Sequence, residues 1–536
     1  MMIAFVLFDY GCKDIIESIP AYSSRYGSSA VHVVDNTILS SVFVPFKWGR
    51  STRLEILKIA SDKQPVAYKS LLSALESSSV LGTGSCLDRM VHGYMGKKVL
   101  SMRNEDIRPN VIVFTIETMR AYENSGLRVP MYNGTTVSLT PNLDRLRSRG
   151  ADWRNFYTVN VNSPGAYYAQ EHGHYNDGGG HTYDERLHGY TEVLDNMGYE
   201  MYRLTPDGFA SSPGYQKVPY PNKVTAYLGE WGGWFTSKDI LLKHPMVKAI
   251  SKHKKKHGDD PYYLEVRTPG GTHIMWQLFE DSEKEFSEEF TAGLEQLREK
   301  AMNEVFPTAD GVHHKDYYKV EDKNELYRDM LKTYWLADQF IGKTLDDLRA
   351  KGLAKNTLVI VQGDHGHGLE HGVATVPMRE QYHVPFVVSD VDDDVIHSST
   401  RNITNKEVSS NLDFGATLLD LLNAPGYVTD GIGHSLNRKM NSKGNKRHIV
   451  SRHGGEWIVR NQTHTMNFYP SGSLVDIKVW DTSIDPYQQY APHVYSVPNT
   501  DDIHLHWLHT YREMSLLWEK SIESCGQHFN QTPTVQ

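Results

Sequence analysis

Short runs of apolar, β-branched and aromatic residues constrain the fold of this chain more than any other feature. They cover residues 111–116, 262–266, 358–361 and 384–389, and such runs are typical of strands buried on both faces of a sheet. A further strand is expected at 199–204, directly after a helical pattern. Strands that alternate with helices predict parallel crossover connections. We therefore predict an α/β fold in which a mostly parallel central sheet carries helices on both faces.

Acidic and histidine side chains stand where two of these predicted strands end. Asp364 and His365 follow the run at 358–361, between two glycines, and Glu117 follows the run at 111–116. Ligand sites of open α/β sheets lie at the carboxyl ends of the strands, and a carboxylate beside an imidazole suits a metal ion. The alternative is a turn with a satisfied aspartate and solvated charges, but the convergence of these groups favours a metal site.

Ser163 begins a second feature of the same edge. Ser163-Pro164 predicts a helix start with the serine as N-cap, as Thr140-Pro141 does earlier in the chain. A hydroxyl there lies beside free N–H groups and the positive end of the helix dipole, an environment that stabilises an alkoxide and binds an anionic ester. The simpler interpretation is a cap with no chemical role.

Further candidate substrate-binding residues lie in loops. His172 opens a glycine- and histidine-rich stretch that runs to residue 181, for which a pocket-lining role and a purely flexible connection both stay open. His273 and Trp276 follow the strand at 262–266 and are expected at the same sheet edge, where His273 is either a substrate contact or a structural histidine.

Composition limits the classes of function. The chain has 536 residues and a net charge of −9 spread over its length, which gives no support for a nucleic-acid partner. No apolar run is long enough to span a bilayer, and the first residues lack the features of a secretory signal, so membrane association would require a longer N-terminus.

The three cysteines are too far apart to suggest a disulfide framework. Sequons that permit glycosylation in a secretory setting occur at Asn133, Asn402, Asn461 and Asn530.

Three regions are predicted. Residues 1–108 carry no motif and are interpreted as an accessory region, 109–440 as the catalytic domain, and 441–536 as a small antiparallel α+β subdomain with a tail. A long amphipathic helix is expected at 325–350. Residues 210–258, rich in glycine, proline and aromatic side chains, are interpreted as a surface insertion with a solvated lysine run.

Several ordered segments together resemble the sulfatase family, within the alkaline-phosphatase-like superfamily. The resemblance covers roughly residues 110–491, and its order and spacing are more specific than any single piece. The segments that carry it are NVIVFTIETMR, TPNLDRLRSRGADWRNFY, LADQFIGKTLDDLRAKGLAKNTLVIVQGDHG, DGIGHSL and VWDTSIDPYQQYA.

The resemblance implies roles for the candidate residues. Glu117, Asp364 and His365 would be metal ligands, Ser163 the nucleophile and also a ligand, and His273 a contact of the transferred group. Glutamate in place of the family's usual first aspartate is similar to the lipoteichoic-acid-synthase and phosphoethanolamine-transferase branches, which use one divalent metal. We therefore expect one divalent ion: manganese, zinc, calcium or magnesium.

The sequence also departs from the sulfatase pattern. Sulfatases carry C/S-x-P-x-R, whereas Ser163-Pro-Gly-Ala-Tyr167 has its proline one place early and no arginine, so we do not expect conversion to formylglycine. The family's Lys-Trp-His segment is absent, and Arg379 is the nearest match to the basic residue that follows the Asp-His-Gly turn.

These departures favour phosphate mono- or diesters, cleaved by a hydrolase or transferase with a serine nucleophile, over sulfate esters. Sulfate-ester hydrolysis is the first alternative, and an inactive ligand-binding pseudoenzyme is the second. The expected substrate is a small-molecule, glycan or lipid ester, and we expect a secretory or membrane-associated location rather than a cytoplasmic one.

Overall fold

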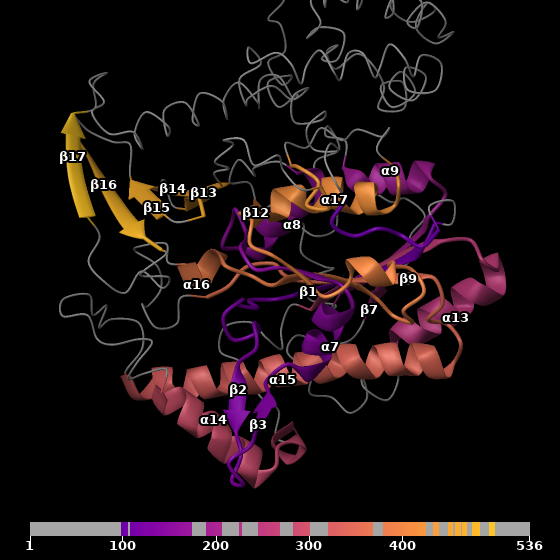
Figure 1. Ribbon diagram of the computed structural model, residues 1–536, viewed down its shortest axis with the longest axis horizontal. Coiled ribbons are helices and arrows are strands. Elements are labelled where there is room, and N and C mark those ends of the chain that lie inside the picture. Colours follow the sequence, from indigo (N-terminus) through magenta and orange to yellow (C-terminus); the bar gives the residue numbers. More distant parts are fainter. Residues whose placement is uncertain are drawn as a thin grey trace, which may run out of the picture.

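The computed structural model describes the chain from residue 98 onward, with gaps, and Figure 1 shows how its elements are arranged. The described residues are 98–104, 108–173, 189–205, 225–227, 245–268, 282–300, 320–367, 379–424, 433–438, 449–453, 456–462, 464–468, 474–482 and 493–498. The predicted accessory region 1–108 lies almost entirely outside them.

An eight-stranded, mostly parallel sheet forms the centre of the molecule, as predicted. Its strand order is β11-β4-β10-β9-β1-β8-β6-β7. Strand β1 is paired in parallel with β9 on one side and with β8 on the other, whereas β10 runs antiparallel to β9. The strands are β1 (Asn110–Ile116), β4 (Ala151–Trp153), β6 (Glu200–Thr205), β7 (Thr225–Tyr227), β8 (Tyr262–Thr268), β9 (Thr357–Gly363), β10 (Phe386–Asp390) and β11 (Ile403–Asn405).

The register of the three central strands sets the position of the residues that follow them. Ile116 lies opposite Gly363 of β9 and opposite Thr268 of β8. All three strands therefore end at the same level. Glu117 and Asp364, the next residues of β1 and β9, are brought to neighbouring positions at the carboxyl edge of the sheet.

Helices cover both faces of the sheet, as Figure 1 shows. Because side chains alternate along a strand, Ile112 and Phe114 of β1 enter one core, while Val111 and Val113 enter the other. The first face carries α7 (Pro141–Arg149), α13 (Pro245–His257), α14 (Glu288–Lys300) and α15 (Val320–Ala350), and the second carries α9 (Tyr190–Asn196) and α17 (Phe414–Leu421). Helix α8 (Ser163–His172) lies on the second side, against α9 and α17.

Part of the predicted surface insertion at 210–258 belongs to the core, so that interpretation was wrong for this part. Strand β7 extends the central sheet, and α13 buries Met246, Val247 and Ile250 in the first core. The lysines at 254–256 lie on the exposed side of the same helix, as predicted. An amphipathic helix whose polar face is almost entirely basic is easily mistaken for a solvated loop.

A second, antiparallel sheet follows the central sheet in the sequence. Its strands are β13 (Ile449–His453), β14 (Glu456–Arg460), β15 (His464–Phe468), β16 (Leu474–Asp481) and β17 (His493–Pro498), in sequence order. Ile449 and Ile458 of this sheet share a cluster of buried side chains with Ala169 of α8 and Tyr157. The sheet therefore packs against the same buried side chains as α8. The predicted boundary at 440 falls in residues that the structure does not describe.

Short elements complete the fold. They are β2 (Arg128–Pro130) and β3 (Thr136–Ser138), which form a hairpin against α14, β5 (Phe156–Tyr157), β12 (Ser409–Ser410), α16 (Arg379–Tyr382), and single 3-10 turns at Ser282–Glu285, Ser398–Thr400 and Asn411–Asp413. Among the described residues, no helix combines the length and the apolar character that a membrane span requires.

Candidate active site

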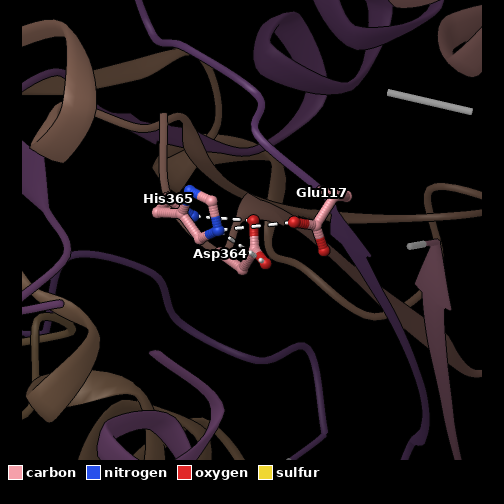
Figure 2. A group of neighbouring side chains, drawn as sticks. All are labelled: Glu117, Asp364 and His365. Atoms are coloured by element: carbon pink, nitrogen blue, oxygen red, sulfur yellow. Dashed lines mark hydrogen bonds and ion pairs between the residues drawn. The ribbon is translucent and has the colours of Figure 1, made fainter. Parts of the chain in front are cut away.

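Three side chains predicted as metal ligands meet at the carboxyl edge of the central sheet. Figure 2 shows Glu117, from the end of β1, and His365 pointing toward each other across Asp364, from the end of β9. His365 Nε2 lies 3.3 Å from Glu117 Oε1 and 3.7 Å from Asp364 Oδ2. One ligand atom from each residue lies within 4.8 Å of the others, which is close enough for all three to bind one ion.

Ser163 lies against the same group. Its Oγ is 2.8 Å from Glu117 Oε1, 3.0 Å from Glu117 Oε2 and 3.2 Å from His365 Nε2. The serine is buried, with 6% of its surface exposed. The structure therefore brings together four predicted residues that are far apart in the sequence.

The cap of α8 differs from the prediction. Asn162, not Ser163, is the N-cap, and its side-chain oxygen accepts a hydrogen bond from the backbone N–H of Gly165 at 2.8 Å. Ser163 is instead the first residue of the helix, followed by Pro164. Because the asparagine satisfies the helix terminus, the serine hydroxyl is available to Glu117 and His365.

Burial and like charge shape the electrostatics of the site. Burial raises the pKa of Asp364, and the nearby Glu117 carboxylate raises it further, to about 8. Burial alone would lower the pKa of His365, but the carboxylates of Asp364 and Glu117 outweigh that effect and raise it to about 9. Two carboxylates held this close repel each other when both are ionised, so a divalent ion would stabilise the form in which both are ionised.

Hydrogen bonds to the surrounding backbone orient Asp364 and His365 so that both could bind a cation. Asp364 Oδ1 accepts hydrogen bonds from the backbone N–H groups of Thr118 and His365, at 2.9 and 2.7 Å. Its Oδ2 is buried and accepts no hydrogen bond from the described residues. His365 Nδ1 lies 2.9 Å from the Gly366 carbonyl oxygen; donating there leaves Nε2, which faces the carboxylates, as the nitrogen that would bind an ion after losing its proton. The residues present thus fit a divalent ion bound by oxygen and nitrogen.

The turn that carries Asp364 and His365 has no room for larger residues. A Cβ on Gly366 would lie 1.8 Å from the carbonyl oxygen of Glu380, and one on Gly363 would lie 2.5 Å from that of Met119. The Gly366 N–H also donates to the Gln381 carbonyl oxygen at 2.8 Å. The turn is therefore fixed between the segment that follows β1 and helix α16.

The predicted substrate contacts are only partly described. His273 and Trp276 lie outside the described residues, and Arg379 begins α16 without a described side chain. His172 was expected to open a loop but is the last residue of α8, which ends at Gly173 in the left-handed conformation. Its ring is buried, with its centroid 4.8 Å from that of Tyr168. The expectation of a loop at His172 was therefore wrong.

Sequence reasoning missed a buried charged network beneath α8. Glu265 of β8 binds Arg203 Nε at 2.7 Å and Arg267 Nε at 2.9 Å, and Gln170 of α8 donates to it at 3.1 Å. The Arg267 guanidinium lies 3.9 Å from the centre of the Tyr167 ring, one turn beyond the serine.

The network changes the pKa of Glu265, and the spacing of its residues is visible in the sequence. Burial alone would raise the pKa of Glu265, but the two guanidinium groups outweigh it and lower the pKa. Glu265 and Arg267 stand two residues apart on a buried strand, a spacing that places both on one face. That pattern could have indicated the network in advance.

Comparisons with known proteins agree with this geometry. A sequence model of the sulfatase family, described as "Sulfatase", matches residues 109–424. No curated protein matches the chain. The matched segment contains all four residues of the site described above.

Solved structures share the fold at low sequence identity. A candidate sulfatase, yidJ from Bacteroides fragilis, is 15% identical, with a TM-score of 0.55 over 79% of this chain and 97% of its own. The phosphonate monoester hydrolase of Agrobacterium radiobacter is 15% identical, with a TM-score of 0.53 over 77% and 96%. An alkaline phosphatase superfamily protein from Vibrio parahaemolyticus is 14% identical, with a TM-score of 0.51 over 92% and 100%.

Proposed function

This chain belongs to the sulfatase family, and we propose that it is a metal-dependent hydrolase or transferase that cleaves phosphate mono- or diesters through Ser163. One observation carries the proposal: the Ser163 hydroxyl lies within hydrogen-bonding distance of both Glu117 and His365, at a helix N-terminus. Glu117, Asp364 and His365 would hold one divalent ion. When bound, that ion supplies Lewis acidity, which lowers the pKa of a neighbouring hydroxyl.

The reaction proceeds by two displacements. Ser163 loses its proton toward Glu117, and its Oγ forms a bond to phosphorus while the bond to the leaving ester oxygen breaks. The leaving oxygen keeps the bonding electron pair and takes a proton. We assign the donation of that proton to His273. Water, or an acceptor alcohol, then attacks the phosphoseryl ester, and the serine oxygen regains a proton. The positive end of the α8 dipole, beside Ser163, stabilises the negative charge in both steps.

Phosphate is the favoured ester because the nucleophile is expected to remain a serine. The segment Ser163-Pro-Gly-Ala-Tyr167 lacks the C/S-x-P-x-R pattern that precedes conversion to formylglycine. At the fifth position, the structure has the buried ring of Tyr167 stacked on Arg267. We expect a small-molecule, glycan or lipid ester as substrate. Sulfate-ester hydrolysis is the competing activity, since family membership alone is compatible with it.

The central test replaces the nucleophile. Ser163→Ala should lower turnover of p-nitrophenyl phosphate and of bis-p-nitrophenyl phosphate by about 10³-fold or more, with an unchanged circular dichroism spectrum. Ser389→Ala is the matched control, because Ser389 is a buried serine of β10 remote from the turns that carry the site. Retained activity in Ser163→Ala would remove the serine from its role.

Three measurements separate the alternatives. Faster turnover of p-nitrophenyl sulfate than of both phosphate esters would favour the sulfatase alternative, as would a formylglycine mass at residue 163. A protein with no activity on any of these esters, and no divalent ion retained after purification, would favour the pseudoenzyme alternative. A stoichiometric ion lost in Asp364→Asn would support the enzyme.

A further inference from the structure

The residue that follows Glu117 has a strained backbone. Thr118 has a φ of +50°, in the left-handed region that β-branched residues rarely adopt. In this conformation its N–H donates to Asp364 Oδ1 at 2.9 Å. The bend therefore links the two turns that carry Glu117 and Asp364, and strain of this kind persists only where neighbouring groups hold it.

One side chain holds both ends of this bend. The hydroxyl of Tyr334 donates to the Thr118 carbonyl oxygen at 2.6 Å and accepts from the Arg120 backbone N–H at 3.2 Å. Tyr334 is fully buried on α15, on the sheet face opposite α8 (Figure 1). The phenol thus reaches the turn from the side away from Ser163.

The helix that carries this hydroxyl is held in place by its packing in the core. Tyr334 stands in the middle of the 31-residue helix α15, and Leu331, Ala337 and Ile341 around it are buried in the first core. Arg120, the other end of the bend, donates from its guanidinium to the His367 carbonyl oxygen at 3.3 Å. Both turns at the site are therefore tied to each other and, through Tyr334, to the helix layer.

We infer that Tyr334 is a positioning residue: its hydroxyl keeps Thr118 in the left-handed conformation, so that Glu117 and Asp364 are held ready for the same cation. The two bonds of the hydroxyl described above go to backbone atoms of the turn, so the role is an indirect one. The inference rests on the metal site of the proposed function. Groups that orient metal ligands without binding the ion commonly change metal affinity by about 10–100-fold when removed.

The test removes only the hydroxyl. In Tyr334→Phe the ring keeps its packing, and we expect the affinity for Mn²⁺, measured by titration calorimetry on the metal-free protein, to fall by about 10–100-fold. Excess Mn²⁺ should restore most of the turnover. In the metal-free protein, the amides of Thr118 and Arg120 should exchange hydrogen faster than in the wild type.

A matched control comes from the opposite end of the same strand. The Tyr199 hydroxyl donates to the Pro109 carbonyl oxygen at 2.9 Å, just before β1, and Tyr199 is likewise buried. Tyr199→Phe therefore makes the same chemical change against the same strand and should leave Mn²⁺ affinity within about twofold. A second variant adds Thr118→Gly to Tyr334→Phe. Glycine adopts a positive φ freely, so this double variant should regain part of the lost affinity.

The outcomes distinguish this inference from the proposed function. Wild-type Mn²⁺ affinity in Tyr334→Phe, with binding still abolished by Glu117→Gln, would overturn the positioning role and leave the metal site standing. A wild-type protein that binds no Mn²⁺, or whose binding survives Glu117→Gln, would overturn the proposed function itself. A Tyr334→Phe protein that fails to fold would also contradict the inference, because the hydroxyl would then serve the whole fold.

Discussion

At the scale of single residues, the site places three buried ionisable side chains around one hydroxyl. Glu117 is fully buried and Asp364 nearly so, and the raised pKa of Asp364, about 8, reflects burial and the repulsion between the two carboxylates. Protons and a divalent ion would therefore compete for the same atoms, and metal binding would depend on pH.

Metal affinity should fall as the pH falls. The pKa of Asp364 is about 8 and that of His365 about 9 in the metal-free protein, so both hold protons below those values and must release them to bind an ion. We expect the apparent affinity for Mn²⁺ to drop by at least about tenfold per pH unit between pH 8 and pH 6. Calorimetry in two buffers of different ionisation enthalpy would check the proton release. An affinity that is constant over this range would contradict it.

The site residues could be predicted from the sequence where a strand fixes their position in the sheet. They could not be predicted where a side chain far away in the sequence fixes the position. Glu117 and Asp364 could be named because each follows a buried strand, and parallel strands end at one edge. The role of the Tyr334 hydroxyl could not, because its partner Thr118 is 216 residues away. Asn162 was missed for a different reason: asparagine and serine are both good N-caps. Only the structure shows that Asn162 has the extended backbone and accepts the bond from Gly165.

At the scale of elements, the start of α7 shows how one helix is held by another. Thr140 occupies the N-cap position, as predicted, but its side chain makes no capping hydrogen bond. Asp338 of α15 takes that role. Its carboxylate accepts from the backbone N–H groups of Asn142 and Leu143 at 3.0 and 2.8 Å, and from the Asn142 side chain at 2.8 Å. The long helix thus fixes the helix that leads into β4.

Removing this inter-helix cap should destabilise the fold. Burial raises the pKa of Asp338 to about 6, so at pH 7.5 the carboxylate is still ionised and accepts these bonds. Asp338→Ala should lower the free energy of unfolding by about 1–3 kcal/mol, measured by urea denaturation. Asp346→Ala is the control on the same helix: its pairs with Arg145 and Arg349 are exposed and should contribute less than about 1 kcal/mol. Equal losses in the two variants would contradict the capping role.

For most elements, local sequence patterns were enough to predict a helix or a strand. Burial of one face leaves a periodic pattern of apolar residues, and burial of both faces leaves a continuous apolar run. The helix expected at 325–350 is α15, and the run at 358–361 lies within β9. Local patterns failed where the polar side of an element dominated its composition, as in α13. They also could not predict that β10 runs antiparallel to β9, since strand direction depends on the path of the connecting chain.

At the scale of the whole molecule, the site and the fold are linked through stability. A protein that binds an ion only when folded is stabilised by about 2.7 kcal/mol at a free ion concentration 100 times the dissociation constant. Saturating Mn²⁺ should therefore raise the melting temperature by a few degrees, and EDTA should reverse the shift.

Glu117→Gln should abolish this shift, because it removes one of the three side chains that would hold the ion. Differential scanning calorimetry of both proteins, with and without the ion, measures the two shifts. An unchanged shift in Glu117→Gln would place the ion elsewhere.

The central position of β1 has a consequence for the synthesis of this protein. One bond from β1 to its neighbour β8 spans 152 residues, and one to β9 spans 247. Translation adds about 5–20 residues per second, so this very apolar strand leaves the ribosome roughly ten seconds or more before either partner exists. Throughout that interval it presents two bare edges to the cell. The central strand order that brings distant site residues together therefore leaves β1 unpaired in the nascent chain until β9 has been made. We expect a chaperone, or a similar factor, to protect the nascent chain from aggregation during that time.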